Sequence, residues 1–585
     1  MDIQKQFTDR VSPSILKAQV TLPFEPTIAA YRVWESELPV LNPKVADRLF
    51  SESIQALLST DMQAADKFGI AEEAQSCLSR LLAGCKRSIE GAKLPLPTKQ
   101  TEISSELLNV LSDFNSVYMD VICSSDFLAV EKASDEDSAS PVFPDQQKGL
   151  VIFRALEFLS TSQFLKALIY KSPESEFWNY VNALFSLAEQ LQLHQISYPM
   201  LSEKKVSSAE NEFKKIHLFH LARTNRFRQR EIETIHTILA EQTVDVLLSN
   251  NHDDSFDFYV DVAAPSAITH TSALPQSNNN IRFLNNECLI QYMLSDDIIA
   301  PERHGAISLI SSKPLLTKKT IQMLLPSWST TQSRQASRQS QSDEVLVYPG
   351  FDSIIKALVN KQKTPTDNKK TNPSKTPIGF GVSDLELIPI DSSGHHHNAI
   401  NSSSAINKML KASSENELSS NSIWRTKKPV KFGEKGEEMG AEINDSSLQG
   451  LRFTLSSDNK SLLNASDIIG IKTKTQSLQL AIIRRMNNLT NGDVSVGVEM
   501  MSPQLKIASI KFHDKEKAAK PVIFLQGIPA INQPDAIISP LLLENLNEDI
   551  VIKSNNKTSY YSIDKIIATN QVFTHYSVSK QVNVD

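Results

Sequence analysis

The chain has 585 residues and carries 60 Lys and Arg against 67 Asp and Glu, which gives a formal net charge of −7. This length predicts about two to four domains, and the share of apolar residues, 40%, is typical of a globular protein. The negative balance argues against a general DNA- or RNA-binding protein, which would need a basic surface, so an anionic ligand would have to meet a local basic loop.

The cysteines and the hydropathy pattern bear on the compartment. The four cysteines show no C-x-x-C and no metal-ligand spacing, which suits a reducing compartment; they are Cys77, Cys85, Cys123 and Cys288. The N-terminus has no signal-peptide h-region, and no apolar run reaches ~20 uncharged residues. We therefore expect a cytoplasmic protein without a membrane span.

Taken in chain order, an irregular, proline-spaced N-terminal arm at 1–42 precedes a helical domain at 43–300. In that domain, apolar residues recur at three- and four-residue spacings, as in helices with one buried face. Short loops between them predict antiparallel packing, and the pattern leaves open a degenerate helical repeat. The helical runs are 43–90, 102–129, 150–170, 174–193, 209–223 and a run that follows Arg230.

Short strands and one more helix are expected after these helices, and one of the helices carries a cluster of basic residues. Partial alternation at 256–262 and 281–284 predicts short strands, and 315–325 predicts one more helix. Within the helix at 209–223, five basic residues are expected to form a solvated face; they are Lys214, Lys215, His217, His220 and Arg223.

Residues 330–515 differ in character from the helical domain. A strand is expected at 344–349 and a short helical or extended stretch at 351–359. A polar insertion at 360–440, poor in aliphatic residues, is expected to be disordered. It contains three adjacent histidines (His395, His396 and His397), which we attribute to composition, so no metal site is expected.

Strand patterns return after this insertion. They cover 451–455, 468–473, 478–486 and 494–500, with an Asn-Gly-Asp turn at 491–493. Strands at 8–12-residue spacing with such turns predict a small antiparallel β-barrel. The tail at 519–582 has further strand-like runs, which fit either a second β module or extra strands of the same barrel.

Two polar motifs flank the insertion. Arg334 and Arg338 form R-x-x-x-R, and Asp445, Ser447 and Gly450 form D-x-S-x-x-G. The first pattern is weak, because Arg226 and Arg230 match it equally well at what we expect to be a solvated helix start. The second is sharper, although an ordinary Asx or Ser turn also explains it.

In this order, with strands after each motif, the pair resembles the ligand signature of PilZ domains, which bind the bacterial second messenger cyclic di-GMP. Arg484 and the Gly497-Val498-Glu499 run also match the close of a PilZ barrel. The whole layout is similar to long bacterial cyclic di-GMP receptors with a helical region before an atypical PilZ domain. The resemblance implies an α+β multidomain protein: an all-α region, a PilZ-like antiparallel β-barrel and a C-terminal β-rich extension.

The resemblance also implies a role for each motif. Arg334 and Arg338 would clasp phosphates and guanine faces, because a guanidinium fork binds both. Asp445, Ser447 and Gly450 would line the barrel surface that receives the bases, with the acceptor-only carboxylate facing guanine donors. The ligand is then cyclic di-GMP, with no cofactor.

The function expected from these features is that of a receptor that relays cyclic di-GMP to a protein partner through its helical region. The sequence lacks G-x-x-x-x-G-K-[ST], H-E-x-x-H and G-x-S-x-G, and the hallmarks of cyclic di-GMP synthesis or hydrolysis, so we do not expect an enzyme. The alternative is a PilZ-like interaction scaffold that has lost ligand binding.

Overall fold

The structure is a computed structural model that describes most of the chain. The described residues are 3–11, 21–39, 41–128, 143–201, 205–275, 279–300, 314–329, 339–340, 343–363, 438–447, 450–458, 463–473, 477–502, 505–512, 520–527, 534–540, 549–554, 557–569 and 572–581. The R-x-x-x-R stretch with Arg334 and Arg338 lies outside them, as do most of the predicted insertion and its three histidines.

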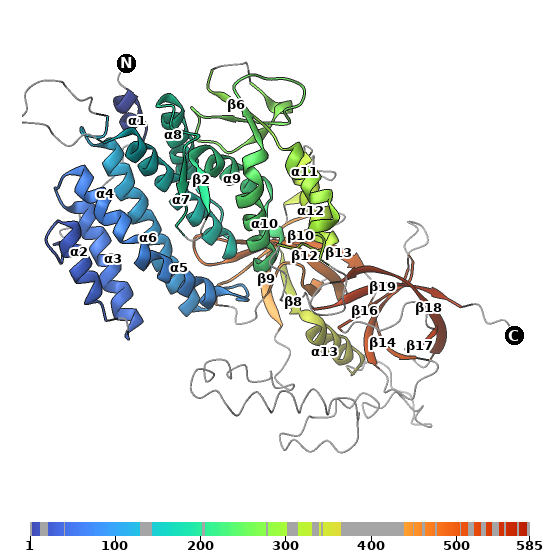
Figure 1. Ribbon diagram of the computed structural model, residues 1–585. Helices are drawn as coiled ribbons and strands as arrows, with labels where there is room; N and C mark the ends of the chain where they lie inside the picture. Colours follow the sequence, from blue (N-terminus) through green and yellow to red (C-terminus); the bar gives the residue numbers. More distant parts are fainter. Residues whose placement is uncertain are drawn as a thin grey trace, which may run out of the picture.

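The N-terminal half is built of α-helices packed side by side (Figure 1). All the predicted helical runs are confirmed as helices. Among the described residues, no helix is both long enough and apolar enough to cross a membrane. The helices are α1 (Ile3–Val11), α2 (Ile28–Ser36), α3 (Pro43–Ser59), α4 (Ala64–Glu73), α5 (Gln75–Ile89), α6 (Thr98–Cys123), α7 (Asp145–Leu168), α8 (Ser175–Gln190), α9 (Ala209–Leu221), α10 (Gln229–Gln242), α11 (Glu287–Leu294) and α12 (Lys318–Ser329).

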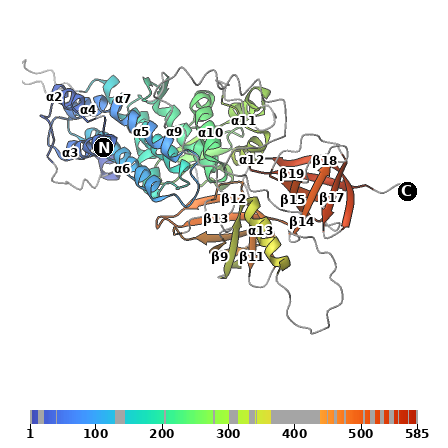
Figure 2. The same cartoon turned by 90° about the horizontal axis from the view of Figure 1, so that it is seen from below.

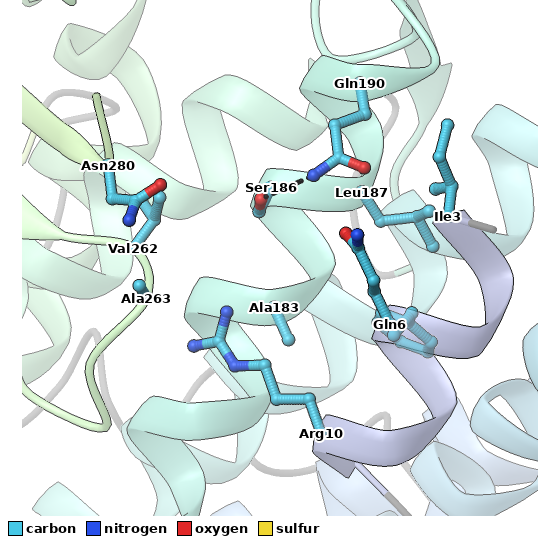
Figure 3. A pocket seen from close by; sticks show the side chains of 11 residues that line it. Ile3, Gln6, Arg10, Ala183, Ser186, Leu187, Gln190, Val262, Ala263 and Asn280 are labelled. Carbon is cyan, nitrogen blue, oxygen red and sulfur yellow. Dashed lines mark hydrogen bonds between the residues drawn. The ribbon is translucent and has the colours of Figure 1, made fainter. Parts of the chain in front are cut away.

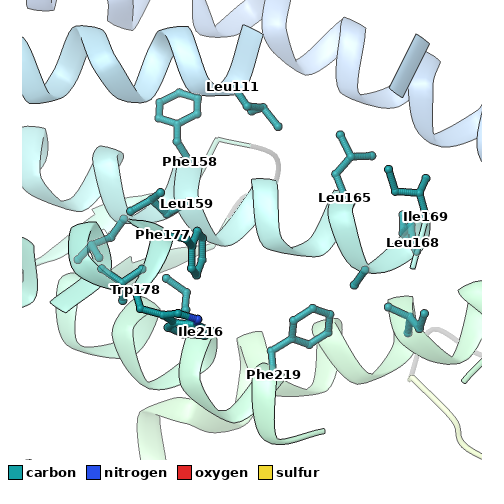
Figure 4. Packing of buried hydrophobic residues seen from close by; sticks show 14 of the residues in the cluster. Leu111, Phe158, Leu159, Leu165, Leu168, Ile169, Phe177, Trp178, Ile216 and Phe219 are labelled. Carbon is teal, nitrogen blue, oxygen red and sulfur yellow. The ribbon is translucent and has the colours of Figure 1, made fainter. Parts of the chain in front are cut away.

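Helix α7 lies at the centre of this region and is buried on all sides, because α6, α8, α9 and α10 pack around it. Its Phe158 stacks on Phe114 of α6, with 5.2 Å between ring centroids. On the other side, Phe164 meets Phe219 of α9 at 6.4 Å. Figure 4 shows this apolar packing between the layers of helices. A helix that is buried on all sides is stable only inside such a bundle.

The expectation of an irregular N-terminal arm was wrong, since this stretch contains α1 and α2. Thr27 caps α2 by accepting a hydrogen bond from the Ala30 amide at 3.2 Å, and Tyr31 is fully buried. Helix α1 packs against α8, where the Arg10 Nε donates to Asn179 Oδ1 at 2.9 Å. Prolines between the two helices obscured their short apolar periods.

The solvated basic face predicted for 209–223 was wrong for three of its five residues, since only His220 and Arg223 are exposed. Lys214, Lys215 and His217 are buried, because α9 is enclosed by neighbouring helices. The Lys215 Nζ lies 2.6 Å from a carboxylate oxygen of Glu212, and the Lys214 Nζ lies 3.1 Å from Glu210. Acidic residues one turn earlier on the same helix therefore compensate both buried ammonium groups.

A small antiparallel sheet, in the order β3-β6-β4-β5, follows α10 and confirms the two predicted short strands. A separate two-stranded ribbon, β1 with β2, precedes α9. The bounds are β1 (Ser197–Pro199), β2 (Val206–Ser208), β3 (Leu247–Ser249), β4 (Phe258–Asp261), β5 (Thr269–His270) and β6 (Ile281–Asn285).

The predicted β-barrel is present. Its strands run in the order β10-β13-β12-β11-β8-β9, and the pairing of β9 with β10 closes the ring. Strand β7 pairs with the last two residues of β9, on the same edge of β9 as β8. Gly492, with φ +85°, forms the predicted turn between β12 and β13, and α13 (Gly350–Lys363) packs on β8 and β11. The strands are β7 (Gln339–Ser340), β8 (Glu344–Pro349), β9 (Met439–Ser446), β10 (Gly450–Leu455), β11 (Ile468–Thr473), β12 (Gln479–Asn488) and β13 (Val494–Ser502).

The C-terminal β-rich extension is a second closed barrel, in the order β14-β15-β16-β19-β18-β17, and not extra strands of the first. Figure 2 shows it beside the first barrel at the C-terminal end of the molecule. A shared apolar cluster joins the two barrels; it includes Ile354 of α13, Leu480 of β12 and Ile538 of β16. The strands are β14 (Leu505–Phe512), β15 (Lys520–Leu525), β16 (Ala536–Ser539), β17 (Asp549–Ser554), β18 (Lys557–Thr569) and β19 (Thr574–Lys580).

The helical region and the first barrel share one core and several polar contacts. Leu94 forms an isolated β-bridge with Leu463, and the Asn488 amide donates to the Tyr170 carbonyl at 2.8 Å. These contacts join helical segments to loops and strands that are more than three hundred residues away in sequence.

Candidate functional site

The D-x-S-x-x-G motif connects β9 to β10 on the first barrel. Asp445 lies near the end of β9, and Gly450 begins β10. Between them, the Ser447 amide donates to the Gly450 carbonyl at 2.8 Å, and the Ser447 hydroxyl lies 3.3 Å from the same oxygen. The motif therefore closes a short hairpin connection, which the turn chemistry of Asp, Ser and Gly favours.

Gly450 is required at its position by the neighbouring strand. A Cβ atom there would lie 2.6 Å from the backbone carbonyl oxygen of Val498 in β13. Every other residue type would push these two backbones apart, so the motif glycine permits the close approach of β10 and β13.

Asp445 is buried and ion-paired. Its Oδ2 lies 2.7 Å from an Nη atom of Arg452, the residue directly opposite in β10. The Asp445 side chain is 11% exposed and that of Arg452 is 44% exposed, so the pair lies at the barrel surface and the carboxylate is its more buried member. The Nε of Arg452 is buried and has no hydrogen-bond partner among the described residues.

Strand β7 pairs with the end of β9 that carries Asp445. Gln339 pairs with Ser446, and Ser340 pairs with Asp445. Arg338 is the residue immediately before Gln339 in the sequence. The R-x-x-x-R stretch, although outside the described residues, is thus attached directly to a strand that pairs with the D-x-S-x-x-G segment.

A row of polar positions crosses the outer face of the barrel from this point. Asp445, Arg452, Gly497 and Arg485 are directly opposite one another on β9, β10, β13 and β12. Opposite residues of antiparallel strands point to the same face, and Phe453 and Leu455 occupy the inner face of β10. A Cβ at Gly497 would lie 2.6 Å from the Nε of Arg485, so the Arg485 side chain lies over this glycine.

The residues that resemble the last strands of a PilZ barrel lie next to this row of polar residues. Arg484 occupies a bulge in β12, and its Nε lies 2.7 Å from a carboxylate oxygen of Glu499. Gly450 is opposite Glu499 in the β10–β13 pair. Arg484, Gly497 and Glu499, which carried the resemblance, therefore lie beside the D-x-S-x-x-G segment.

Arg452 and Arg485 were missed by sequence reasoning. The alternation of β10 places residue 452 on the same face as residue 450, and this signal could have identified Arg452. Arg485 could not have been found in this way, because the bulge at Arg484 changes the alternation of β12.

Other parts of the described structure offer weaker sites. No group of three or more His, Cys, Asp or Glu residues within the described ranges could hold a metal ion. A pocket between α1, α8 and the β4 end, shown in Figure 3, has a volume of about 180 Å³ and includes Arg10 and Gln190. It is too small for a cyclic dinucleotide, because sites for ligands of that size span ~300–1,000 Å³.

Comparisons with known proteins agree with this geometry. The family model described as "Cyclic-di-GMP receptor FimW, N-terminal domain" matches residues 29–252, and that described as "Cyclic-di-GMP receptor FimW, middle PilZ domain" matches residues 258–506. No curated protein and no solved structure matches the chain. The second match covers every strand of the first barrel and the D-x-S-x-x-G segment, and it confirms the PilZ resemblance. The chain therefore belongs to the FimW family of receptors, in which a helical N-terminal region precedes a PilZ domain and cyclic di-GMP is the ligand.

Proposed function

We propose that this protein binds cyclic di-GMP on the outer face of its first barrel, between the D-x-S-x-x-G segment and the R-x-x-x-R stretch, and relays binding to a protein partner. The observation that carries the proposal is the pairing of β7 with β9. Arg338 directly precedes β7 in the sequence, so this pairing supports a site to which both motifs contribute, although they are more than one hundred residues apart in the chain. A ligand with two phosphates and two guanines needs both kinds of group at one place.

Each motif has the chemistry for a different part of the ligand. Arg334 and Arg338 supply guanidinium forks for phosphates and for the O6 and N7 atoms of guanine. Asp445 supplies a carboxylate for the N1 and N2 donors on the other edge of guanine. Gly450 lets β10 lie close to the Val498 carbonyl of β13, and its proposed role is to hold the backbone beside Ser447 in that position.

The receptor acts without catalysis, since its family is one of receptors. The helical region is the proposed partner surface, supported by exposed apolar side chains at Val244 and Leu247, which are 63% and 61% exposed. The cytoplasm is the proposed location, supported by four free cysteines.

Isothermal titration of cyclic di-GMP into the wild-type protein tests the proposal. We expect saturable binding in wild type and a loss of about tenfold or more in affinity in Arg334→Ala, Arg338→Ala and Asp445→Ala, because one bidentate contact contributes roughly 1–3 kcal/mol. Linear GTP, at the same concentration, should give no comparable heat.

Arg230→Ala is the matched control. Arg230 belongs to the second R-x-x-x-R of the chain and is exposed at the start of α10, so its replacement should leave binding unchanged. Absence of binding in folded wild-type protein would favour the interaction scaffold instead. Equal losses in Arg230→Ala and Arg334→Ala would show that general charge, and not the proposed site, drives association.

A further inference from the structure

The outer face of the first barrel meets a turn of the helical region that brings a further arginine close to it. The short 3₁₀ turn η1 (Thr224–Arg226), between α9 and α10, contacts β12. There the Asn225 Nδ2 donates to Asn487 Oδ1 at 2.8 Å. Asn487 is two residues beyond Arg485 on the same strand, so η1 lies on the outer face that carries the polar row.

Arg226 is partly buried, as are the other two residues of this turn. The expected solvated helix start holds for Arg230, which is exposed, but not for Arg226, which lies before the helix against the barrel. No carboxylate forms an ion pair with Arg226 in the part of the chain that the structure describes. Burial lowers the pKa of its guanidinium, and three nearby guanidinium groups lower it further; they belong to Arg223, Arg484 and Arg485.

Lys319 of α12 adds to this positive field. Burial and then the charge of Arg484 lower the pKa of its ammonium group, whereas Glu231 and Glu499 act in the opposite direction. Like charges gathered at a half-buried junction repel one another, and an anion would relieve that repulsion. The positive charge at this junction therefore favours the binding of a negatively charged group.

The side chain of Arg485 connects this cluster to the proposed ligand site. It lies over Gly497, which separates β12 from Arg452 and Asp445 in the polar row. Three strand spacings of about 4.8 Å place the Asp445 position roughly 14 Å from the Arg485 position. Two linked nucleotides can extend along this row from the Asp445 end toward the junction.

We infer that the helical region completes the dinucleotide site: Arg226, together with Arg485, binds a phosphate of cyclic di-GMP and so strengthens the existing contact between η1 and the barrel when the ligand is bound. This inference rests on the proposed function, and it identifies η1 as the element of the helical region that responds to bound cyclic di-GMP. Turn η1 directly connects α9 to α10, and α9 packs on the central helix α7. Neutralising the positive charge at this junction would therefore affect a turn that is connected, through α9, to the core of the helical bundle.

The test measures cyclic di-GMP binding by isothermal titration in Arg226→Ala, Arg226→Lys and Arg230→Ala proteins. We expect Arg226→Ala to weaken binding about tenfold or more, Arg226→Lys to retain part of the affinity as a point charge without the fork, and Arg230→Ala to match wild type. Melting temperatures of the ligand-free proteins should agree, which separates loss of binding from loss of folding.

Two further measurements make the test independent of that one substitution. Gly497→Ala places a Cβ where the Arg485 side chain now lies, and it should weaken binding by displacing that arginine while keeping the charge of the protein. Hydrogen exchange should show ligand-dependent protection of the amides of residues 224–226 in wild type.

The outcomes distinguish this inference from the proposed function. Wild-type protein that binds no cyclic di-GMP overturns both. Wild-type binding that Arg334→Ala abolishes but Arg226→Ala leaves within twofold overturns the inference alone, as does bound ligand without protection of η1.

Discussion

At the scale of single residues, two glycines shape the outer face of the first barrel for different reasons. Gly450 admits the backbone carbonyl of Val498, which cannot move without disturbing a strand pair. Gly497 admits the side chain of Arg485, which can rotate away. The same substitution should therefore damage structure at one position and arginine placement at the other.

Gly450→Ala is expected to lower the free energy of unfolding by roughly 1–3 kcal/mol and to weaken cyclic di-GMP binding, because β10 must move away from β13. Thermal unfolding and isothermal titration measure the two effects. Gly440→Ala in β9 is the matched control, since a Cβ there meets nothing within 4 Å. Equal melting temperatures for both variants would contradict the backbone explanation.

At the scale of elements, helix α9 shows that a run of charged residues can lie in the core and not on the surface, because neighbouring helices pack against it. Its lysines looked like a solvated face, yet Lys215 is 3% exposed and Glu212 is 1% exposed, and each neutralises the other. A buried pair of this kind adds little net stability, but removing one partner leaves an uncompensated charge in the core.

Lys215→Met is expected to lower the free energy of unfolding by about 3–5 kcal/mol, because Glu212 stays buried without its cation. The double variant Lys215→Met/Glu212→Gln should recover most of this loss. Denaturant unfolding monitored by circular dichroism gives both values. Lys86→Met serves as a control, since Lys86 is 51% exposed and its pair with Glu233 should contribute ~1 kcal/mol or less. A single variant as stable as wild type would mean that Glu212 finds another partner.

At the scale of the whole molecule, the helical region and the first barrel are joined by a buried ion pair. An Nη atom of Arg228, before α10, lies 2.7 Å from Asp467 Oδ1, before β11, and its Nε donates to the Ala465 carbonyl at 3.1 Å. Burial raises the pKa of the Asp467 carboxyl, and Arg228 partly offsets this rise. The contact holds the barrel next to η1, where ligand binding is inferred to act.

Arg228→Ala should split thermal unfolding into separate transitions for the helical region and the barrel, because Asp467 loses its cation. The pKa of Asp467 then rises further above its value in the unfolded chain. A carboxyl with a raised pKa favours folding when protonated, so the variant's deficit should be larger at pH 8 than at pH 5. Calorimetry at both pH values measures this difference. The same deficit in Arg228→Ala/Asp467→Asn, or no pH dependence, would contradict the assignment.

Much of the fold could be predicted because its signals are local. Short runs rich in apolar residues over 451–455, 468–473 and 494–500 predicted strands that the structure contains, and the Asn-Gly-Asp run predicted the turn before the last of them. The spacing of Asp445, Ser447 and Gly450 marked a hairpin connection in the same way. Each of these patterns reports a backbone preference of a few consecutive residues.

Sequence by itself therefore determined the helical half, the antiparallel strands, the family resemblance and the residue types suited to a guanine dinucleotide. Only the tertiary structure decided that β7 pairs with the end of β9, that Arg485 lies over Gly497, that α9 buries its lysines and that η1 meets the barrel. The physical reason is that strand pairing and burial depend on segments far apart in the chain. Local periodicity specifies which face of an element is apolar, but not which partner covers it.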